Sequence, residues 1–219
     1  MHTITEALCA SIVNSFDRAR LAETPFPHWL LEDCLPPEVV TMILALPFEA
    51  PDLNGVSGKR ELHNATRIYF DAANRSTFPV CAALCGAFQD GQVCERLARR
   101  FGAKLSGTYL RIEYAQDTDG FWLEPHTDIG VKVFTMLLYL SRDKQHATLG
   151  TDLYDADKVH VGCVPFASNA GMVFIPSGVS YHGFERRKIV GVRKSLIINY
   201  VTGEWRAREQ LAFPDQPIA

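Results

Sequence analysis

The feature that most constrains the fold is a change in hydrophobic periodicity near residue 107. Before it, apolar residues recur at helical spacing over residues 4–20, 38–46 and 78–101. After it, the spacing changes to the period of two that is typical of strands, with Gly, Asp and Asn in several of the gaps. Eight strand-like runs follow, over 108–115, 121–128, 132–141, 150–154, 159–164, 171–176, 180–186 and 192–201. This order predicts a mainly β fold, a jelly roll (double-stranded β-helix) supported by N-terminal α-helices.

Two parts of the first half depart from helical spacing. Residues 25–31 contain two prolines, each of which disfavours helix in the residue before it, so an extended segment is predicted. Residues 67–70 form a short strand-like run. Between them, residues 48–66 are rich in Gly, Asn, Asp and Ser. We expect this segment to be a mobile loop that covers the functional site when a ligand binds.

Length and composition bound the class of protein. We predict one domain over residues 1–219, with a helical support and loop segment (1–106), a jelly-roll core (107–201) and a C-terminal tail (202–219). The formal net charge of −3 argues against a nucleic-acid partner. No apolar run is long enough to cross a membrane, and the N-terminus lacks a basic start followed by an apolar block. The 6 cysteines form no CxxC pair, so reduced thiols in a cytoplasmic protein are expected.

A candidate metal site comes from three residues of the β-rich half. His126 and Asp128 are two residues apart, so on a strand or at its end they point to the same side. His182 lies on the seventh run and is the natural third ligand, because a jelly roll can bring this run beside the second. Two imidazoles and one carboxylate suit Fe(II), with Mn, Co, Ni or Zn as competitors, and they leave positions open for other ligands.

Arg193 is the candidate anchor for an anionic ligand. It shares one face of the last run with Ser195, Ile197 and Asn199, and a buried guanidinium there requires an anionic partner. With no acidic residue near it on that face, the expected partner is a carboxylate of a dicarboxylate cosubstrate, with the Ser195 hydroxyl assisting. The alternatives are an ion pair with an Asp or Glu distant in sequence, and Lys194 as the anchor.

Five further residues are candidates for contacts with ligands. Either of two phenols, those of Tyr114 and Tyr139, could donate to a cosubstrate oxygen, with core packing as the alternative. Arg111 and Glu113 share a face of the first run, and Asn199 could point into the same cavity. These three suggest a polar or zwitterionic substrate such as an amino-acid derivative. An exposed cross-strand pair is the alternative for the two charges.

The ordered motifs resemble those of the Fe(II)/2-oxoglutarate-dependent dioxygenase superfamily, most of all its prolyl-4-hydroxylase-like branch. The matching segments are 112–114 (IEY) and 124–128 (EPHTD) around the metal motif, 172–177 (MVFIPS) through His182 and Gly183 around the distal ligand, and 193–195 (RKS) at the cosubstrate anchor. The sequence differs from the pattern of this branch in two segments that bear on the identity of the substrate. The loop between Tyr114 and His126 is longer, and residues 141–149 lack the usual paired glycines.

The resemblance implies a non-haem oxygenase that uses Fe(II), 2-oxoglutarate and O₂, with ascorbate as an optional reductant in vitro. Decarboxylation of 2-oxoglutarate to succinate would accompany hydroxylation of a C–H bond in a small polar molecule or an amino-acid residue. The presence of Asp128 favours hydroxylation over halogenation, while desaturation and ring closure stay open. The implied site residues are His126, Asp128 and His182 for the metal, and Arg193, Ser195, Tyr114 and Tyr139 for 2-oxoglutarate. The alternatives are a cupin-like metal-dependent isomerase, a non-catalytic metal- or ligand-binding jelly roll, and an inactive relative.

Overall fold

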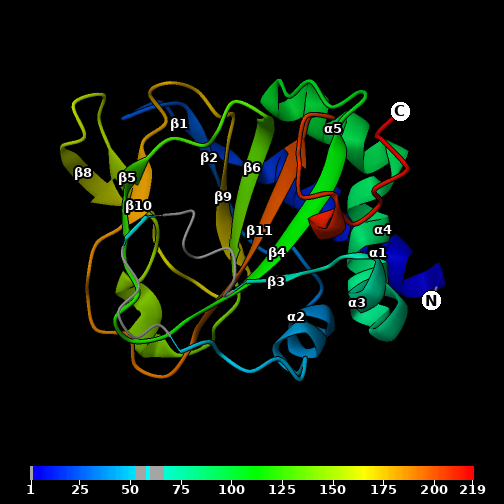
Figure 1. The fold of residues 1–219 in the computed structure, drawn as a ribbon, viewed down its shortest axis with the longest axis horizontal. Coiled ribbons are helices and arrows are strands. Elements are labelled where there is room, and N and C mark those ends of the chain that lie inside the picture. Colours follow the sequence, from blue (N-terminus) through cyan, green and yellow to red (C-terminus); the bar gives the residue numbers. More distant parts are fainter. Residues whose placement is uncertain (1, 53–57, 60–66) are drawn as a thin grey trace.

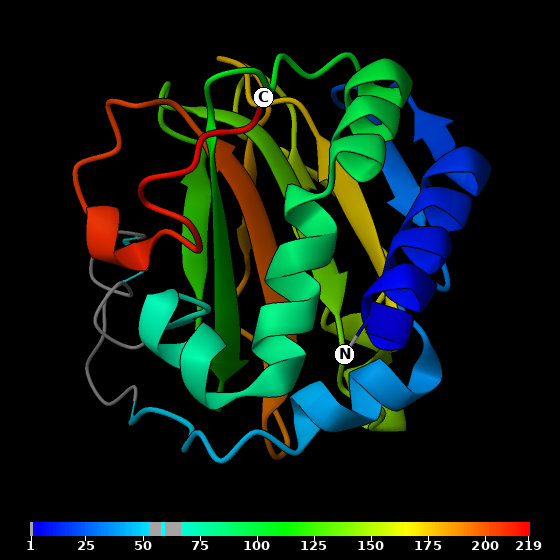
Figure 2. The same cartoon turned by 90° about the vertical axis from the view of Figure 1, so that its right-hand side faces the viewer.

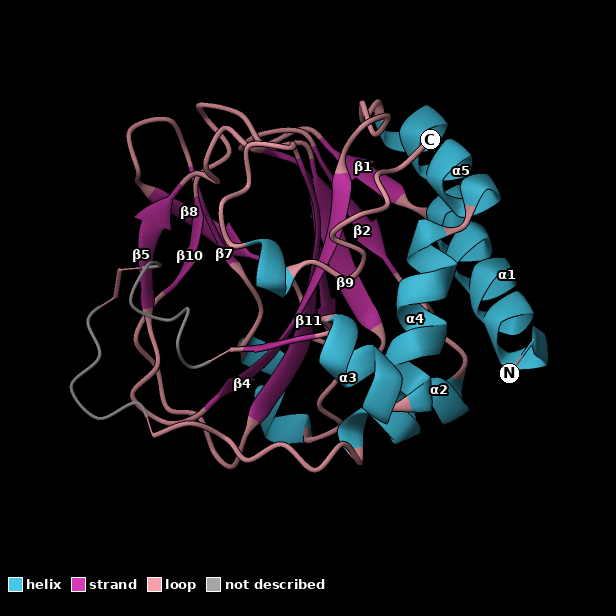
Figure 3. Cartoon of the chain, turned by 45° about the vertical axis from the view of Figure 1, so that its right-hand side comes forward, coloured by secondary structure: helices cyan, strands magenta, loops and turns pink. Residues whose placement is uncertain are grey.

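The chain folds in three layers, which Figure 1 shows side by side: helices, a seven-stranded sheet and a four-stranded sheet. The computed structural model describes residues 2–52, 58, 59 and 67–219. The helices cover one face of the large sheet, and the small sheet lies on its other side (Figures 1 and 3). This arrangement is the helix-supported jelly roll predicted from the strand pattern, so the predicted fold class is confirmed.

The described α-helices gather on one side of the molecule, which faces the viewer in Figure 2. They are α1 (His2–Arg18), α2 (Pro37–Leu44), α3 (Ala72–Thr77), α4 (Pro79–Gln89) and α5 (Gly91–Phe101). The chain also has two described 3-10 helices, η2 (Lys144–Thr148) and η3 (Arg208–Gln210). None of the described helices is both long enough and apolar enough to span a bilayer.

One predicted helix is two helices in the structure. The pattern over residues 78–101 predicts a single helix, but the chain breaks at Asp90 between α4 and α5. The Asp90 carboxylate accepts a hydrogen bond of 2.9 Å from the backbone N–H of Gln92 and so caps the start of α5. Such a local bond competes with continuation of the preceding helix. The short helix α3, capped in the same way by Asp71, is not predicted from the sequence.

The strands form two antiparallel sheets. The large sheet has the order β1-β2-β9-β6-β11-β4-β3, and the small sheet has the order β5-β10-β7-β8. Their bounds are β1 (Arg20–Ala22), β2 (His28–Leu31), β3 (Ile68–Tyr69), β4 (Tyr109–Asp117), β5 (Leu123–His126), β6 (Lys132–Tyr139), β7 (Asp152–Tyr154), β8 (His160–Cys163), β9 (Ala170–Phe174), β10 (His182–Phe184) and β11 (Arg193–Val201). Each of the eight predicted runs overlaps one strand from β4 to β11, while β1 is unpredicted.

The central strand β11 separates the core from the space between the sheets. It pairs with β4 on one side and β6 on the other. Leu196, Ile198 and Tyr200 are fully buried in the core under the helices. Each such apolar side chain contributes about 1.5–3 kcal/mol through its burial. Arg193, Ser195 and Ile197, which alternate with residues of the core face, therefore face the small sheet and line a cavity.

Candidate active site

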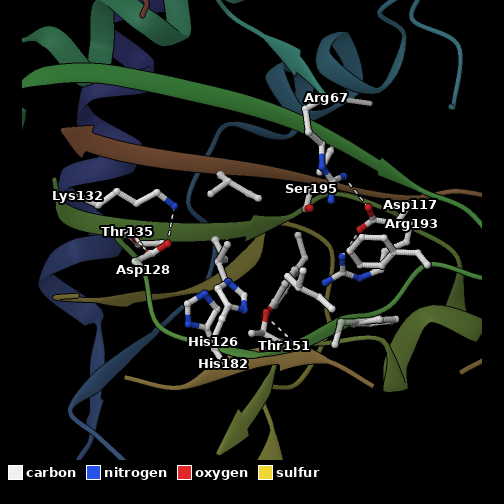
Figure 4. Close-up of a pocket in the computed structure, with 18 residues that line it drawn as sticks. Arg67, Asp117, His126, Asp128, Lys132, Thr135, Thr151, His182, Arg193 and Ser195 are labelled. Atoms are coloured by element: carbon white, nitrogen blue, oxygen red, sulfur yellow. Dashed lines mark hydrogen bonds and ion pairs between the residues drawn. The ribbon is translucent and has the colours of Figure 1, made fainter. Parts of the chain in front are cut away.

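A cavity of about 60 Å³ lies between the two sheets. Its walls come from β4, β6 and β11 of the large sheet and from β5 and β10 of the small sheet. Figure 4 shows two polar ends: Asp128 and Lys132 lie at one end, and Arg67, Asp117 and Arg193 lie at the other. We call these the metal end and the arginine end.

The structure brings the three predicted metal ligands together at the metal end. His182 begins β10 directly opposite His126 at the end of β5, and their ring centroids are 4.4 Å apart. One ligand atom from each of His126, Asp128 and His182 lies within 4.8 Å of the others. Gly183 allows this approach, because a Cβ at that position would lie 2.6 Å from the carbonyl oxygen of Leu123.

Hydrogen bonds orient both imidazoles for a metal. His126 Nδ1 lies 2.9 Å from the carbonyl oxygen of Glu124, and His182 Nδ1 lies 3.0 Å from that of Ser180. A carbonyl oxygen can only accept, so each Nδ1 carries a proton, and Nε2 is the nitrogen of each ring through which a metal ion would be bound. This arrangement, with the Asp128 carboxylate, is a donor set that fits Fe(II) or a similar divalent ion.

The protonation states also fit a metal site. Burial, with a smaller effect of nearby His182, lowers the pKa of His126 to about 3, so its imidazole is neutral at neutral pH. Burial alone would raise the pKa of Asp128. The charges of Lys132 and His182, with hydrogen bonds from Lys132 and Thr135, outweigh burial and hold that pKa below its usual range. The carboxylate is therefore ionised.

Two residues that contact Asp128 are not predicted from the sequence. Lys132 Nζ lies 2.5 Å from Asp128 Oδ1, and Thr135 Oγ1 donates to Asp128 Oδ2 at 2.6 Å. Asn199 Nδ2 donates in turn to Thr135 Oγ1 at 2.9 Å. Period two along β6 places Thr135 on the same face as the predicted residue Tyr139, and this signal could have found it.

The arginine end corrects the expectation that Arg193 has no acidic neighbour. Arg193 Nη1 lies 2.6 Å from Asp117 Oδ2, and Arg193 Nε donates to the Leu149 carbonyl oxygen at 2.7 Å. Asp117 stands directly opposite Arg193 in the β4–β11 register. The predicted run ends at residue 115, whereas β4 continues to Asp117, so the sequence reading missed this cross-strand partner.

A second guanidinium shares the same carboxylate. Arg67 Nη1 lies 2.6 Å from Asp117 Oδ1, and Arg67 Nε lies 3.3 Å from Glu113 Oε1. Within the described part of the chain, no hydrogen bond to Arg193 Nη2 or to the Ser195 hydroxyl is found. Two cations thus flank one bridging carboxylate, and Arg193 keeps donor capacity for a further acceptor.

The two candidate tyrosines lie on opposite faces of the large sheet. Tyr139 lines the cavity, and its hydroxyl lies 2.7 Å from Thr151 Oγ1. Burial raises the pKa of Tyr139 to about 12, so the phenol remains protonated. Tyr114 instead packs in the core under the helices, 6.3 Å from the Phe70 ring. Its predicted contact with a cosubstrate is therefore wrong, because period two turns its side chain away from the cavity.

Lys194, the alternative anchor, also faces away from the cavity. Its Nζ donates to the Leu44 carbonyl oxygen at 3.3 Å, and its ammonium lies 6.0 Å from the Tyr114 ring centroid. The geometry therefore favours Arg193 over Lys194 as a group that can meet a ligand.

The three predicted substrate residues lie on the cavity-facing side of the large sheet, but outside the cavity lining. Arg111 contacts Glu113 Oε2 at 2.8 Å and Asn199 Oδ1 at 3.1 Å, and all three side chains are buried. None of them lines the cavity. This burial excludes an exposed ion pair, and the predicted contact with a substrate stays a prediction. The three residues instead support Thr135 at the metal end and Arg67 at the arginine end.

The predicted mobile loop over residues 48–66 falls mostly outside the described residues, which omit 53–57 and 60–66. Of the described part, the Gly58 carbonyl oxygen accepts a hydrogen bond of 2.9 Å from the backbone N–H of Glu124. This contact places residue 58 beside β5, next to the metal end.

Comparisons with known proteins identify the fold. No protein-family model matches the chain, and no curated protein matches its sequence. A prolyl 4-hydroxylase structure from Phytophthora capsici matches with a TM-score of 0.61 at 17% identity, covering 93% of this chain and 67% of that one. A Pseudomonas putida prolyl-4-hydroxylase matches at 0.58 and 18% identity, covering 89% and 98%. HygX from Streptomyces hygroscopicus, solved with nickel and 2-oxoglutarate bound, matches at 0.51 and 13% identity, covering 80% and 81%.

These matches define the class of fold. The chain has the fold of the 2-oxoglutarate- and Fe(II)-dependent oxygenases, in the form found in prolyl 4-hydroxylases. The resemblance inferred from the sequence motifs is thus confirmed at the level of the fold.

Proposed function

We propose that this chain, as a single domain over residues 1–219, is an Fe(II)- and 2-oxoglutarate-dependent oxygenase. It would hydroxylate a C–H bond of a small polar molecule or an amino-acid residue, with release of succinate and CO₂. The observation that carries this proposal is one cavity with a His-Asp-His group at one end and a guanidinium at the other. HygX, which shares the fold, binds nickel and 2-oxoglutarate, and this supports the same pair of ligands here.

At the metal end, the protein's task is to hold three donors in place. His126 and His182 would present Nε2, with each Nδ1 fixed by a backbone carbonyl. Asp128 would present its carboxylate, which Thr135 orients through a hydrogen bond. When bound, Fe(II) would supply the oxidative chemistry with O₂ that side chains cannot perform.

At the arginine end, the protein's task is to bind and align 2-oxoglutarate. Arg193, held by Leu149 and Asp117, would donate to the carboxylate farthest from the metal. Ser195 and Tyr139 line the same part of the cavity and would add hydroxyl donors. Because Arg193 is fixed at the end of the cavity opposite the histidines, it would orient the other end of the cosubstrate toward the metal end.

The cavity walls between the two ends are largely apolar. Phe121, Leu123, Leu137 and Phe184 line it. Such walls exclude water from the reacting groups and strengthen the polar contacts at both ends. The proposed partners are therefore a cosubstrate held at both ends of the cavity and a small-molecule or amino-acid-type substrate that enters beside it.

The proposal is tested by coupled measurements of binding and turnover. The purified protein with Fe(II), ascorbate and 2-oxoglutarate should form succinate and CO₂ in equal amounts, with one atom of ¹⁸O₂ in the succinate. His182→Ala should lose this reaction. His160→Ala should retain it, because His160 bonds to Asp152 and does not line the cavity.

The same experiment separates the alternatives. A metal-loaded protein that binds 2-oxoglutarate but never forms succinate would be a binding module. A protein that binds the metal without any 2-oxoglutarate would point to another class of jelly roll and overturn the proposal.

A further inference from the structure

The proposed function leaves one charged residue of the cavity without a role. Lys132, the first residue of β6, lines the cavity at the metal end, and its side chain is only 8% exposed. Its ammonium lies 2.5 Å from Asp128 Oδ1. Figure 4 shows it on the far side of the histidines from Arg193. The cavity thus carries an anion-binding group at each end.

A metal ion and Lys132 would compete for the same carboxylate. Thr135 already donates to Asp128 Oδ2, and Lys132 contacts Oδ1, so both oxygens have a donor. A divalent cation bound by Asp128 would lie near the ammonium that contacts the same carboxylate, and neighbouring like charges repel strongly inside a protein. An anion near Lys132 would relieve this repulsion.

The long, flexible stem of lysine allows its ammonium to reach such an anion. Four methylene groups let Nζ turn from Asp128 into the cavity without any movement of β6. The cosubstrate would meet Arg193 at the other end, so its distal carboxylate does not need Lys132. Among the residues that the structure describes, the cavity lining has three cationic side chains (Arg67, Lys132 and Arg193) and two acidic ones (Asp117 and Asp128), a balance that favours anionic ligands.

We propose that Lys132 binds a carboxylate of the primary substrate, so that the substrate is an acid and not its neutral counterpart. This inference rests on the proposed function, because it assigns Arg193 to 2-oxoglutarate and the His-Asp-His group to the metal. Lys132 is then a specificity-determining residue that places the substrate beside the metal through its acid group.

The test uses a carboxylate probe and its neutral counterpart. The protein is loaded with Zn(II), which is diamagnetic and does not turn over, and is saturated with 2-oxoglutarate so that Arg193 is occupied. Binding of 4,4,4-trifluorobutyrate and of 4,4,4-trifluorobutyramide is then measured by ¹⁹F NMR line broadening. The acid should bind and the amide should bind at least about tenfold more weakly, as expected for loss of a charge-assisted contact.

Three variants locate the effect. Lys132→Met keeps the apolar stem and should weaken binding of the acid about tenfold or more, while Lys132→Arg should retain it. Lys104→Met removes an exposed lysine outside the cavity and should change nothing. Zinc and 2-oxoglutarate contents are measured for every variant first. If Lys132→Met binds less zinc, the role of Lys132 is tested instead by the difference in affinity between the acid and the amide, measured in the unmodified chain and in Lys132→Arg.

Each outcome has one meaning. Equal binding of acid and amide, absence of acid binding, or undiminished acid binding by zinc-loaded Lys132→Met would overturn the role of Lys132. Failure of 2-oxoglutarate to bind the zinc-loaded unmodified protein would instead overturn the proposed function, and it is detected before the probe is added.

Discussion

The two ends of the cavity are built in different ways. The metal end combines a local pair with one long-range contact, since His126 and Asp128 are two residues apart and His182 meets them across the β5–β10 pair. The arginine end rests on long-range pairing, because Asp117 is 76 residues from Arg193 and 50 from Arg67. A local motif therefore reveals the first, whereas the second exists only once three distant segments have met.

The two ends also differ in the ion pairs that an incoming ligand would meet. At the metal end, an ionised carboxylate is paired with an ammonium that a divalent cation would compete with. At the arginine end, two guanidiniums share one carboxylate, and a second carboxylate could join them without displacing the first. The comparison predicts that single substitutions act on metal binding at one end, and on folding and cosubstrate affinity at the other.

The largest expected effect is at the metal end. His182→Ala should abolish stoichiometric binding of Fe(II) or Co(II), because a histidine and a carboxylate alone leave the ion with two protein donors. Titration calorimetry under anaerobic conditions measures it, with His160→Ala as the matched control. Binding as tight as in the unmodified protein would show that the three residues are not the ligand set.

Asp117→Asn tests whether the arginine end needs its bridging carboxylate for folding. Two buried guanidiniums would lose their shared anion, which should lower the free energy of unfolding by about 3–5 kcal/mol. Urea denaturation measures the change. Asp119→Asn is the control, because Asp119 is half exposed and pairs with exposed Lys188, so this substitution should leave the free energy of unfolding nearly unchanged.

The same variant sharpens the comparison through its ligand dependence. Since 2-oxoglutarate brings a carboxylate to Arg193, it should stabilise Asp117→Asn more than it stabilises the unmodified protein. Equal stabilisation of both would mean that the cosubstrate does not meet this guanidinium pair.

Arg193→Leu should raise the 2-oxoglutarate concentration needed for half-saturation about ten- to a hundredfold, since a charge-assisted anchor contributes about 1.5–3 kcal/mol. Metal affinity should stay within about twofold, because the two ends are separate. Lys194→Leu is the matched control, since Lys194 faces the helical layer. An effect of Lys194→Leu with none of Arg193→Leu would move the anchor by one residue.

The smallest expected effect is on the pH dependence of folding. Burial lowers the pKa of His126 to about 3, whereas the unfolded chain binds this proton near pH 6.5. The unfolded state thus binds more protons below that pH, so the metal-free protein should be most stable above about pH 6.5 and lose stability as pH falls toward 3. In His126→Gln, the free energy of unfolding should fall less steeply between about pH 6.5 and 5. The difference in slope should correspond to the uptake of up to about one proton on unfolding. An unchanged slope would show that His126 titrates normally.

The sequence by itself determined the fold class and the predicted pair of metal ligands His126 and Asp128. Strand periodicity places β4 to β11, because alternation of side chains is a local property of an extended backbone. The same rule puts His126 and Asp128 on one side and separates Arg193 from Lys194. These features depend on neighbours in sequence, so no knowledge of strand pairing is needed.

Only the tertiary structure decided which residues meet. The pairing of Asp117 with Arg193, the orientation of Tyr114 into the helical core, and the burial of Arg111 outside the cavity lining depend on where strands end and how they register. The proximity of Lys132 to Asp128 depends on the turn between β5 and β6. A shift of one residue in the pairing register reverses the face on which each side chain of a strand lies, and the spacing along a single strand does not specify that register.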